Sequence, residues 1–410
     1  MTIVSVLLLS ACGASSTGTD STPSTPSTTT DLQLAKPVGQ QVGCSTATAS
    51  APGLHGVNTH SAVNLLMPFG VAFSSDGSRA FVAVLTNQGV GQPSIGPGHA
   101  DGAIGEYEAT PAGLTSERLG TIGSQEPLGL SLTPDGRYLV AAEGSGAAVL
   151  SVARIENTKV PSSQWAVGTF SSRGQGAIEA AVSADGRFVF VSLEDSNELA
   201  VFNLGRAARL GFGRSDLVGY VPMGVAPVGM AISADGRYLF ATSEADSPTS
   251  TEGTLTTIDL RRAEEDPSRS VVSTVWAGCN PVRVVASPSS AFVTARASDE
   301  LLDFDASDLL ANPSAALQSQ AQVGEAPVGL ALVDGGHLVV VADSNRFLQG
   351  DVSSNLAVVS VRPDGDLQPL GYLPTGGFPR DMVVSPNGKE LLVSDYDTGS
   401  VEEVELGTLP

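Results

Sequence analysis

The chain has 410 residues, and its 21 Lys and Arg are outnumbered by 43 Asp and Glu, which gives a formal net charge of −22. So acidic a chain lacks the basic surface with which proteins bind nucleic acids or anionic lipid headgroups. Hydrophobic residues make up 41% and charged residues only 16%, which excludes a wholly disordered chain. The 46 glycines and 25 prolines are typical of a turn-rich, all-β protein.

The N-terminus begins with a short apolar run, residues 3–9, which is too short to span a bilayer. Leu9-Ser10-Ala11-Cys12 then resembles a bacterial lipobox. This resemblance implies that residues 1–11 are a signal peptide and that the Cys12 thiol carries a lipid. The run lacks the preceding Lys or Arg of most signal peptides, which a mis-assigned start codon would explain. The alternative is a buried N-terminal strand with an ordinary cysteine.

A segment rich in Ser, Thr and Pro follows and, with Cys12, occupies residues 12–35. Such a composition cannot bury apolar surface and forms an extended tether. We therefore expect an exported protein that is lipid-anchored in the bacterial cell envelope, in the outer membrane if the host is Gram-negative. In an exported protein the two remaining cysteines, Cys44 and Cys279, are able to form a disulfide, and the alternative is two free thiols. No Cys-x-x-Cys or Cys/His spacing indicates zinc.

Seven copies of one motif fill the rest of the chain, at intervals of 46 to 59 residues. Each copy begins with an anchor residue, continues with alternating apolar residues, and in most copies reaches Asp-Gly or Asn-Gly before a second apolar run. The seven anchors are Pro68, Pro127, Ala177, Pro227, Pro281, Pro327 and Pro379. A period near 50 residues with strand patterning predicts an all-β, seven-bladed β-propeller over residues 36–410.

Each copy reads as two strands joined by a tight turn, because Asp-Gly and Asn-Gly supply the positive φ of hairpin turns. A third and a fourth antiparallel strand complete each blade. The last copy ends after its third strand, 400–406, so we expect residues 60–67 to supply the fourth strand and close the ring. Residues 204–210 and 306–317 look helical and fall between third and fourth strands.

These repeats resemble the YVTN-repeat seven-bladed propellers, a group that includes the lactonase-type propellers. The stretch Phe378-Pro-Arg-Asp-Met-Val-Val-Ser-Pro-Asn-Gly-Lys is the most lactonase-like, whereas the YVTN tetrapeptide itself is degenerate. The resemblance covers about residues 68–406 and concerns mostly turn and core positions. It implies the fold, and its relatives include both lactone-processing enzymes and surface proteins without known activity.

The second residue after each anchor breaks the pattern in three copies. Four copies have glycine there, but the others have Glu179, Arg283 and Asp381, and Arg380 precedes the last of these. In the family fold these residues belong to the innermost strands, so we expect all four side chains at the channel mouth. They are either an ion-pair network in a water-filled channel or a ligand site. In a lactonase, Glu179 or Asp381 would be the catalytic base and Arg283 or Arg380 its electrostatic partner.

The loops before each anchor and after each second strand share one face, which we call the top face. They are long and rich in carboxylates: Glu143, Glu194, Asp195, Glu244, Asp246, Asp299, Glu300, Asp343, Asp395 and Asp397. These oxygens would suit Ca²⁺, although no Asp-x-Asp-x-Asp-Gly loop occurs, and the alternative is a solvated acidic rim. His99, in a long top loop, is either a solvated side chain or an acid/base group.

No nucleophile elbow, zinc-protease motif or phosphate loop is present in the sequence. We therefore expect a monomeric binding module with a protein or small-molecule ligand on the top face and no required cofactor. The alternatives are a lactonase-type hydrolase acting on a sugar lactone or similar ester, and a purely structural envelope component.

Overall fold

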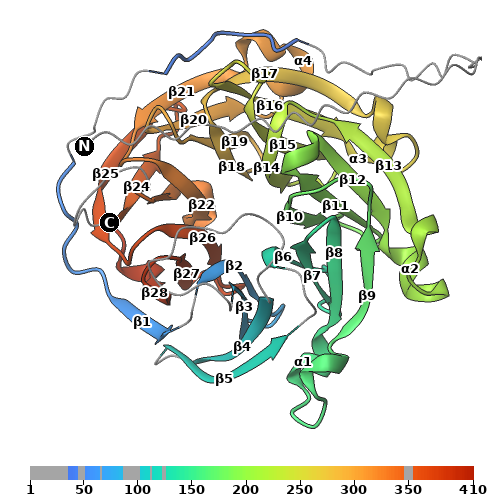
Figure 1. Ribbon diagram of the computed structural model, residues 1–410. Coiled ribbons are helices and arrows are strands. Elements are labelled where there is room, and N and C mark those ends of the chain that lie inside the picture. Colours follow the sequence, from blue (N-terminus) through green and yellow to red (C-terminus); the bar gives the residue numbers. More distant parts are fainter. Residues whose placement is uncertain are drawn as a thin grey trace, which may run out of the picture. The chain divides into compact units, whose positions relative to one another are not determined.

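The computed structural model describes residues 36–44, 51–64, 67–85, 102–110, 113–121, 126–345 and 354–410. Within these ranges the strands form seven four-stranded antiparallel sheets arranged as the blades of a ring, as Figure 1 shows. The predicted fold class, a seven-bladed β-propeller, is therefore confirmed. Cys12, the tether and His99 lie outside the described residues.

The strands of each blade follow one another from the axis outwards. Blade 1 comprises β2 (Pro68–Phe73), β3 (Arg79–Leu85), β4 (Gly102–Thr110) and β5 (Gly113–Thr121). Blade 2 comprises β6 (Pro127–Leu132), β7 (Tyr138–Glu143), β8 (Gly146–Ser151) and β9 (Ala166–Ser171). Blade 3 comprises β10 (Ala177–Val182), β11 (Phe188–Leu193), β12 (Glu198–Asn203) and β13 (Leu217–Pro222). Every predicted anchor residue of these blades begins or lies in an innermost strand.

The same order continues round the ring. Blade 4 comprises β14 (Val225–Ile232), β15 (Tyr238–Ala245), β16 (Glu252–Asp259) and β17 (Val271–Cys279). Blade 5 comprises β18 (Pro281–Ala286), β19 (Ser290–Ala295), β20 (Glu300–Asp305) and β21 (Leu317–Gln322). Blade 6 comprises β22 (Pro327–Val333), β23 (Leu338–Asp343), β24 (Asn355–Val361) and β25 (Leu367–Pro374). Blade 7 comprises β26 (Pro379–Val384), β27 (Glu390–Asp395), β28 (Ser400–Glu405) and β1 (Thr59–Asn64).

The ring closes as the sequence predicts. β1, from the N-terminal side, pairs with β28, and Thr59 lies opposite Val404 in an antiparallel register. This pairing gives blade 7 its fourth strand, so the edge of β28 is not left open to another chain.

The hairpins between first and second strands repeat one hydrogen-bond pattern. In blade 2, Thr133 Oγ1 donates to Asp135 Oδ1 over 2.7 Å, and the same oxygen accepts the N–H of Arg137 at 3.0 Å. Gly136 has a φ of 70°, which a residue with a side chain rarely adopts. The pattern explains why Ser or Thr stands two residues before Asp or Asn in five of the seven copies. We call the face formed by these hairpins the turn face.

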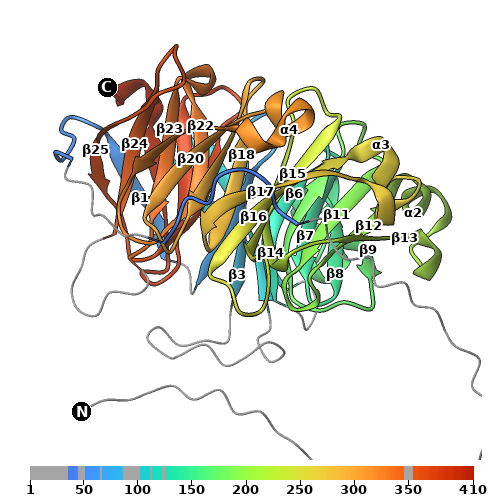
Figure 2. The ribbon, with the colours of Figure 1, turned by 90° about the horizontal axis from the view of Figure 1, so that it is seen from above.

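Among the described residues, four short α-helices lie between third and fourth strands, at the outside of the ring (Figures 1 and 2): α1 (Val152–Glu156), α2 (Leu204–Leu210), α3 (Leu260–Ala263) and α4 (Asp308–Ala311). The predicted helices at 204–210 and within 306–317 are confirmed as α2 and α4, whereas α1 and α3 were not predicted. In the part of the chain that the structure describes, no helix is long and apolar enough to cross a bilayer.

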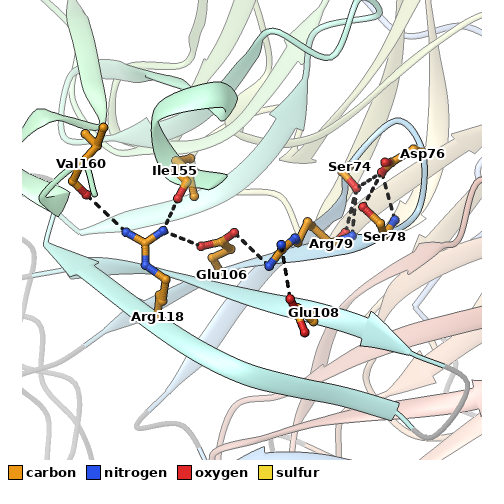
Figure 3. Close-up of polar contacts among 9 residues, drawn as sticks. All are labelled: Ser74, Asp76, Ser78, Arg79, Glu106, Glu108, Arg118, Ile155 and Val160. Atoms are coloured by element: carbon orange, nitrogen blue, oxygen red, sulfur yellow. Dashed lines mark hydrogen bonds and ion pairs between the residues drawn. The ribbon is translucent and has the colours of Figure 1, made fainter. Parts of the chain in front are cut away.

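A buried charge network joins blades 1 and 2 (Figure 3). Glu106 of β4 is 1% exposed, and its carboxylate oxygens lie 3.4 Å from Arg79 Nη1 and 3.2 Å from Arg118 Nη1. Arg118 also donates to the carbonyl oxygens of Ile155 and Val160, which belong to blade 2. Because Glu106 and Arg118 have charged or hydrogen-bonded partners, this network satisfies buried charge between two blades and lies away from the central channel.

The segment before β1 follows the outer edges of two blades. Val38 forms a parallel bridge with Val275 of β17, and Gly53 forms one with Tyr372 of β25. The structure also joins Cys44 to Cys279 in a disulfide with a Cα–Cα distance of 5.4 Å. The described parts of the segment therefore lie along the outer edges of the ring, as Figure 1 shows, and not across the top face.

Candidate functional site

Three of the four predicted charged residues meet in the central channel. Glu179, Arg283 and Asp381 occupy equivalent positions on β10, β18 and β26, the innermost strands of blades 3, 5 and 7. Arg283 Nη1 lies 3.6 Å from Glu179 Oε2, although 104 residues separate them in the sequence. The Arg283 side chain is 8% exposed, so this contact is shielded from solvent. We call Glu179, Arg283 and Asp381 the channel trio.

The backbone of each trio residue is held by a hydroxyl group. The N–H of Glu179 donates to Ser192 Oγ over 3.0 Å, and this hydroxyl donates in turn to the carbonyl of Val228 in the next blade, also over 3.0 Å. The N–H of Arg283 donates to Thr294 Oγ1, and this hydroxyl donates to the carbonyl of Val328. The N–H of Asp381 donates to Ser394 Oγ, and this hydroxyl donates to the carbonyl of Phe69. These bonds fix the trio's backbone relative to the following blade, a form of preorganisation.

The two carboxylates of the trio also contact the backbone of the following blade. Asp381 Oδ2 accepts the N–H of Val71 over 3.0 Å. Burial raises the pKa of Asp381, and this rise is opposed first by the charge of Arg283 and then by the Val71 hydrogen bond. Asp381 is therefore tied to blade 1 and at the same time coupled electrostatically to Arg283.

Glu179 has the more strongly perturbed carboxyl group. Burial raises its pKa to about 7, the charge of Asp381 adds to the rise, and Arg283 opposes it. A carboxyl group with a pKa near 7 exchanges a proton readily at neutral pH, which is the property of a general acid or base. The trio can thus hold either one or two negative charges against a single guanidinium near pH 7.

The trio lines a cavity of about 370 Å³. The rest of its lining is apolar and comes from the innermost strands of blades 4 to 7: Met230, Ala231, Val284, Val285, Ala286, Leu330, Ala331, Leu332, Met382, Val383 and Val384. Since β18 and β26 line it from their third residue to their last, the cavity extends from the trio toward the turn face. A pocket with an apolar wall and a few convergent polar groups is the usual form of a ligand site.

Arg380 does not line this cavity. Its guanidinium carbon lies 3.7 Å from the ring centroid of Phe69, 5.1 Å from that of Phe378 and 5.3 Å from that of Tyr396. The register of β26 against β27 shifts between Pro379 and Asp381, and the neighbouring side chains of Arg380 and Asp381 have different surroundings. Of the four charged side chains that were expected to converge, Arg380 is therefore the one that does not line the cavity; it stacks in an aromatic cluster and still acts electrostatically on Asp381.

A second group of charges lies among the top loops. Arg296 Nη2 lies 2.9 Å from Glu244 Oε1, and both side chains are largely buried. Burial raises the pKa of Glu194, with Glu244 and Asp195 adding to the rise, while Arg380 and Arg296 oppose it. Arg380 thus acts electrostatically on the acidic top loops as well as on Asp381.

Buried carboxyl groups also stand at the ends of second strands, where Glu143, Asp343 and Asp395 pair with the anchors of blades 2, 6 and 7. In blade 7, Thr375 Oγ1 lies 3.1 Å from Asp395 Oδ1 and 2.6 Å from Glu402 Oε2. Burial, with the charge of Glu402, raises the pKa of Asp395 to about 8. One hydroxyl proton serves only one carboxylate, so a protonated Asp395 can donate to Thr375 while Thr375 donates to Glu402.

Among the described residues, no group of three or more His, Cys, Asp or Glu has the geometry to hold a metal ion. Three of the acidic top residues contact a backbone amide, a hydroxyl or an arginine: Asp299 Oδ1 accepts the N–H of Ala326 over 2.9 Å, Asp395 lies beside Thr375, and Glu244 beside Arg296. A Ca²⁺ role for these carboxylates remains a sequence-based expectation.

The residues that support the trio were not predicted from the sequence; they are the hydroxyls of Ser192, Thr294 and Ser394 and the methionines of the cavity wall. A signal for the hydroxyls was present. All three stand one residue before the second-strand residue that pairs with the anchor of their blade, whereas blades 1, 2 and 6 have Ala83, Ala142 and Ala342 at this position. A comparison of these hydroxyl positions with the positions of Glu179, Arg283 and Asp381 would have shown that hydroxyls and charges occur in the same blades.

The fold and the channel define the class of this protein as a seven-bladed β-propeller with a charged, ligand-sized channel. No protein-family model and no curated protein matches the sequence. Solved structures do match. A chain of the hydrazine synthase of Kuenenia stuttgartiensis aligns with a TM-score of 0.59 and 18% identity, over 85% of this chain and 97% of that one.

A chain from a crystal structure of a mitotic checkpoint complex aligns with a TM-score of 0.61 and 13% identity, over 91% of this chain and 97% of that one. At such identities the likeness establishes the propeller fold and carries no residue of one protein over to another.

Proposed function

We propose that this protein is a binding module of the cell envelope whose ligand is a small molecule held by the channel trio. The observation that carries the proposal is the position of Arg283, 3.6 Å from Glu179 and coupled to Asp381, at the end of an apolar cavity of about 370 Å³. Burial of charged groups lowers the stability of the folded protein, and residues that depart from a regular sequence repeat are often functional. The fold supports the proposal because propellers commonly act as interaction modules.

Ligand-induced stabilisation of the full-length chain tests this proposal. A ligand that binds only the folded state raises the melting temperature, so a small-molecule panel can be screened without knowledge of the ligand. A ligand of the channel should stabilise the wild type and Arg269→Met, which removes an exposed arginine, to the same extent, and Arg283→Met to a different extent, because Arg283 sets the charge of the trio. Ligands that stabilise all three proteins equally would contradict the assignment of the site.

Export and lipid anchoring belong to the same proposal and rest on the lipobox-like Leu9–Cys12 and on the tether. The disulfide between Cys44 and Cys279 supports export, because disulfides persist in oxidising compartments. Cys12→Ala should release the protein from the membrane fraction of its host. A native mass that begins at unprocessed Met1 would contradict the anchor.

A lactonase-type hydrolase of the YVTN-like group is the second candidate, and the Glu179 pKa near 7 beside a guanidinium favours it. In that reaction Glu179 would take a proton from water as the oxygen attacks the lactone carbonyl carbon. Arg283 would stabilise the oxyanion; the ring C–O bond then breaks and the leaving oxygen takes the proton, which gives a hydroxy acid.

A panel of sugar lactones tests the second candidate. Wild-type protein should hydrolyse one of them, and Glu179→Gln should lower turnover by about 10²–10⁴-fold, the usual loss on removal of a general base. Turnover that is unchanged in Glu179→Gln would exclude this residue as the base.

A further inference from the structure

We propose that the channel binds a linear amphiphile with a primary ammonium head, with the head beside Glu179 and Asp381 and the apolar body directed toward the turn face. This inference rests on the proposed function and names the chemical class of its ligand. It follows from the charge at one end of the cavity, the chemistry of its wall, and the layer of side chains above the trio.

The charge at the head of the cavity is unbalanced. Glu179, Arg283 and Asp381 are the charged residues that line it, so two carboxylates share one guanidinium. Arg380 acts on Asp381 from beyond the cavity and also acts on Glu194, so it is not a dedicated partner of the trio. A buried carboxylate that lacks a full counter-charge either binds a proton or binds a cation.

The titration of the trio is consistent with this choice. Arg283 from β18 and Asp381 from β26 are the charged groups that act on Glu179, and the N–H of Met230 on β14 is its further partner. With no ligand bound, the elevated pKa of Glu179 means that a proton supplies the missing positive charge near neutral pH. An ammonium head would replace that proton and release it to solvent.

The wall of the cavity suits an alkyl body and not a sugar. Beyond the trio every lining residue is apolar, and Met230 and Met382 are flexible side chains that adapt to irregular ligands. A sugar ring would leave its hydroxyl groups without partners along this wall, which is costly.

An apolar layer lies on the top-face side of the trio. Val282 and Val328, each one residue before the trio position of its strand, pack with Phe378, and all three are buried. Phe69 is also buried there, beneath the Arg380 guanidinium. The cavity lining instead continues to Ala286 and Val384, the last residues of their strands, so we infer that the ligand enters from the turn face.

Isothermal titration of the full-length chain with n-octylammonium, octanoate and 1-octanol tests the inference, because the three probes share one alkyl chain and differ in head charge. We expect octylammonium to bind at least tenfold more tightly than octanol and octanoate not to bind. Affinity should rise about fourfold per methylene from butyl- to octylammonium, as burial of each CH₂ predicts. Affinity should fall about tenfold from pH 8 to pH 6, with proton release on binding.

Two variants locate the binding. Glu179→Gln should abolish the preference for octylammonium over octanol, because the charge imbalance is removed. Ala286→Phe should block the cavity near the turn face, whereas Ala234→Phe, an exposed turn position outside the cavity, should bind like wild type. Circular dichroism and melting of each variant show that it is folded.

Equal binding of octanol or octanoate, or octylammonium binding that survives Ala286→Phe, would overturn the inference. The proposed function would still stand if another small molecule stabilised the protein in an Arg283-dependent way. The proposed function would fail separately if no compound stabilised Arg283→Met and Arg269→Met to different extents.

Discussion

The blades of this ring fall into two groups at the second residue of the innermost strand. Blades 1, 2, 4 and 6 have Gly70, Gly129, Gly229 and Gly329, whereas blades 3, 5 and 7 have the charged trio. A Cβ at Gly70 or Gly229 would collide with a carbonyl oxygen of the next blade, that of Leu128 or Val282. Close packing of the innermost strands around the axis therefore favours glycine at this position. Each blade with a charged residue is followed in the ring by a blade with glycine, which has no side chain to collide with the charged one.

The same two groups differ in how their backbone is held. Every charged blade has a hydroxyl that binds the N–H of its trio residue, whereas three of the four glycine blades have alanine at the hydroxyl position. Blade 4 is the exception, with Thr242 holding Gly229. The charged blades thus carry additional polar groups that closure of the ring does not require, which indicates a role beyond packing.

Among the variants that test the difference between charged and glycine blades, removal of Arg283 should lower the free energy of unfolding most. Arg283→Met leaves two carboxylates in one cavity without their guanidinium, and breaking a buried ion pair costs about 3–5 kcal/mol. The loss should be largest at pH 8 and smaller at pH 5, because Glu179 takes up a proton at the lower pH. Urea unfolding measures it, with Arg269→Met as the exposed control.

The triple variant Glu179→Gly, Arg283→Gly, Asp381→Gly makes all seven blades alike at this position and leaves no unpaired charge. Its stability should be close to that of the wild type. A triple variant as unstable as Arg283→Met would show that the trio holds the ring together, and a binding role would then lose its support.

Addition of a methyl group to a glycine blade should have the next largest effect. Gly229→Ala places a Cβ against the backbone of blade 5, and overpacking of this kind costs about 1–3 kcal/mol. Gly213→Ala is the matched control, since a Cβ there meets no atom within 4 Å. Equal melting temperatures for the two variants would contradict the close approach of the innermost strands.

A titration effect is also expected in the closing blade. The pKa of Asp395 is about 8 in the folded state and near 3.8 when unfolded, so the folded protein binds the extra proton between these values. Stability therefore falls as pH rises from about 4 to about 8, by up to about 1.4 kcal/mol per pH unit from this group. Asp395→Asn should flatten the dependence of melting temperature on pH, and exposed Asp364→Asn should not.

Loss of one supporting hydroxyl should have the smallest effect. Thr294→Val removes the bonds to the Arg283 N–H and to the Val328 carbonyl, which should cost about 1–2 kcal/mol. Thr256→Val is the control, because the Thr256 hydroxyl is equally buried and has no hydrogen-bond partner. A Thr256→Val variant that is as destabilised as Thr294→Val would mean that the contacts of Thr294 contribute nothing specific.

The fold was predictable because its repeat is visible in the sequence. Anchor prolines, alternating apolar residues and Asp-Gly turns specify strands and hairpins locally, and the missing fourth strand of the last copy indicated the closing partner of residues 400–406. Helices α1 and α3 have only 5 and 4 residues, too few to show a helical period; α4 is equally short but lies within a longer helix-like stretch, 306–317, which the sequence does show.

The candidate site was predictable only in part. The charged column identified Glu179, Arg283 and Asp381, but the sequence does not give the depth at which they meet or the direction of the cavity below them. The sequence also does not show that Arg380 stacks on Phe69, Phe378 and Tyr396, next to a register shift between Pro379 and Asp381. The path of residues 36–44 and 51–58 depends on single bridges to Val275 and Tyr372, which leave no pattern in the sequence.

A double-mutant cycle between Glu179 and Arg283 tests the central claim most directly, because these residues come from different blades and can interact only if the trio meets across the channel. The free energy of unfolding would be measured at pH 8 for the wild type, Glu179→Gln, Arg283→Met and the double variant. We predict a coupling energy of about 1–3 kcal/mol, as for residues in direct contact. Additivity within about 0.5 kcal/mol would contradict a channel trio.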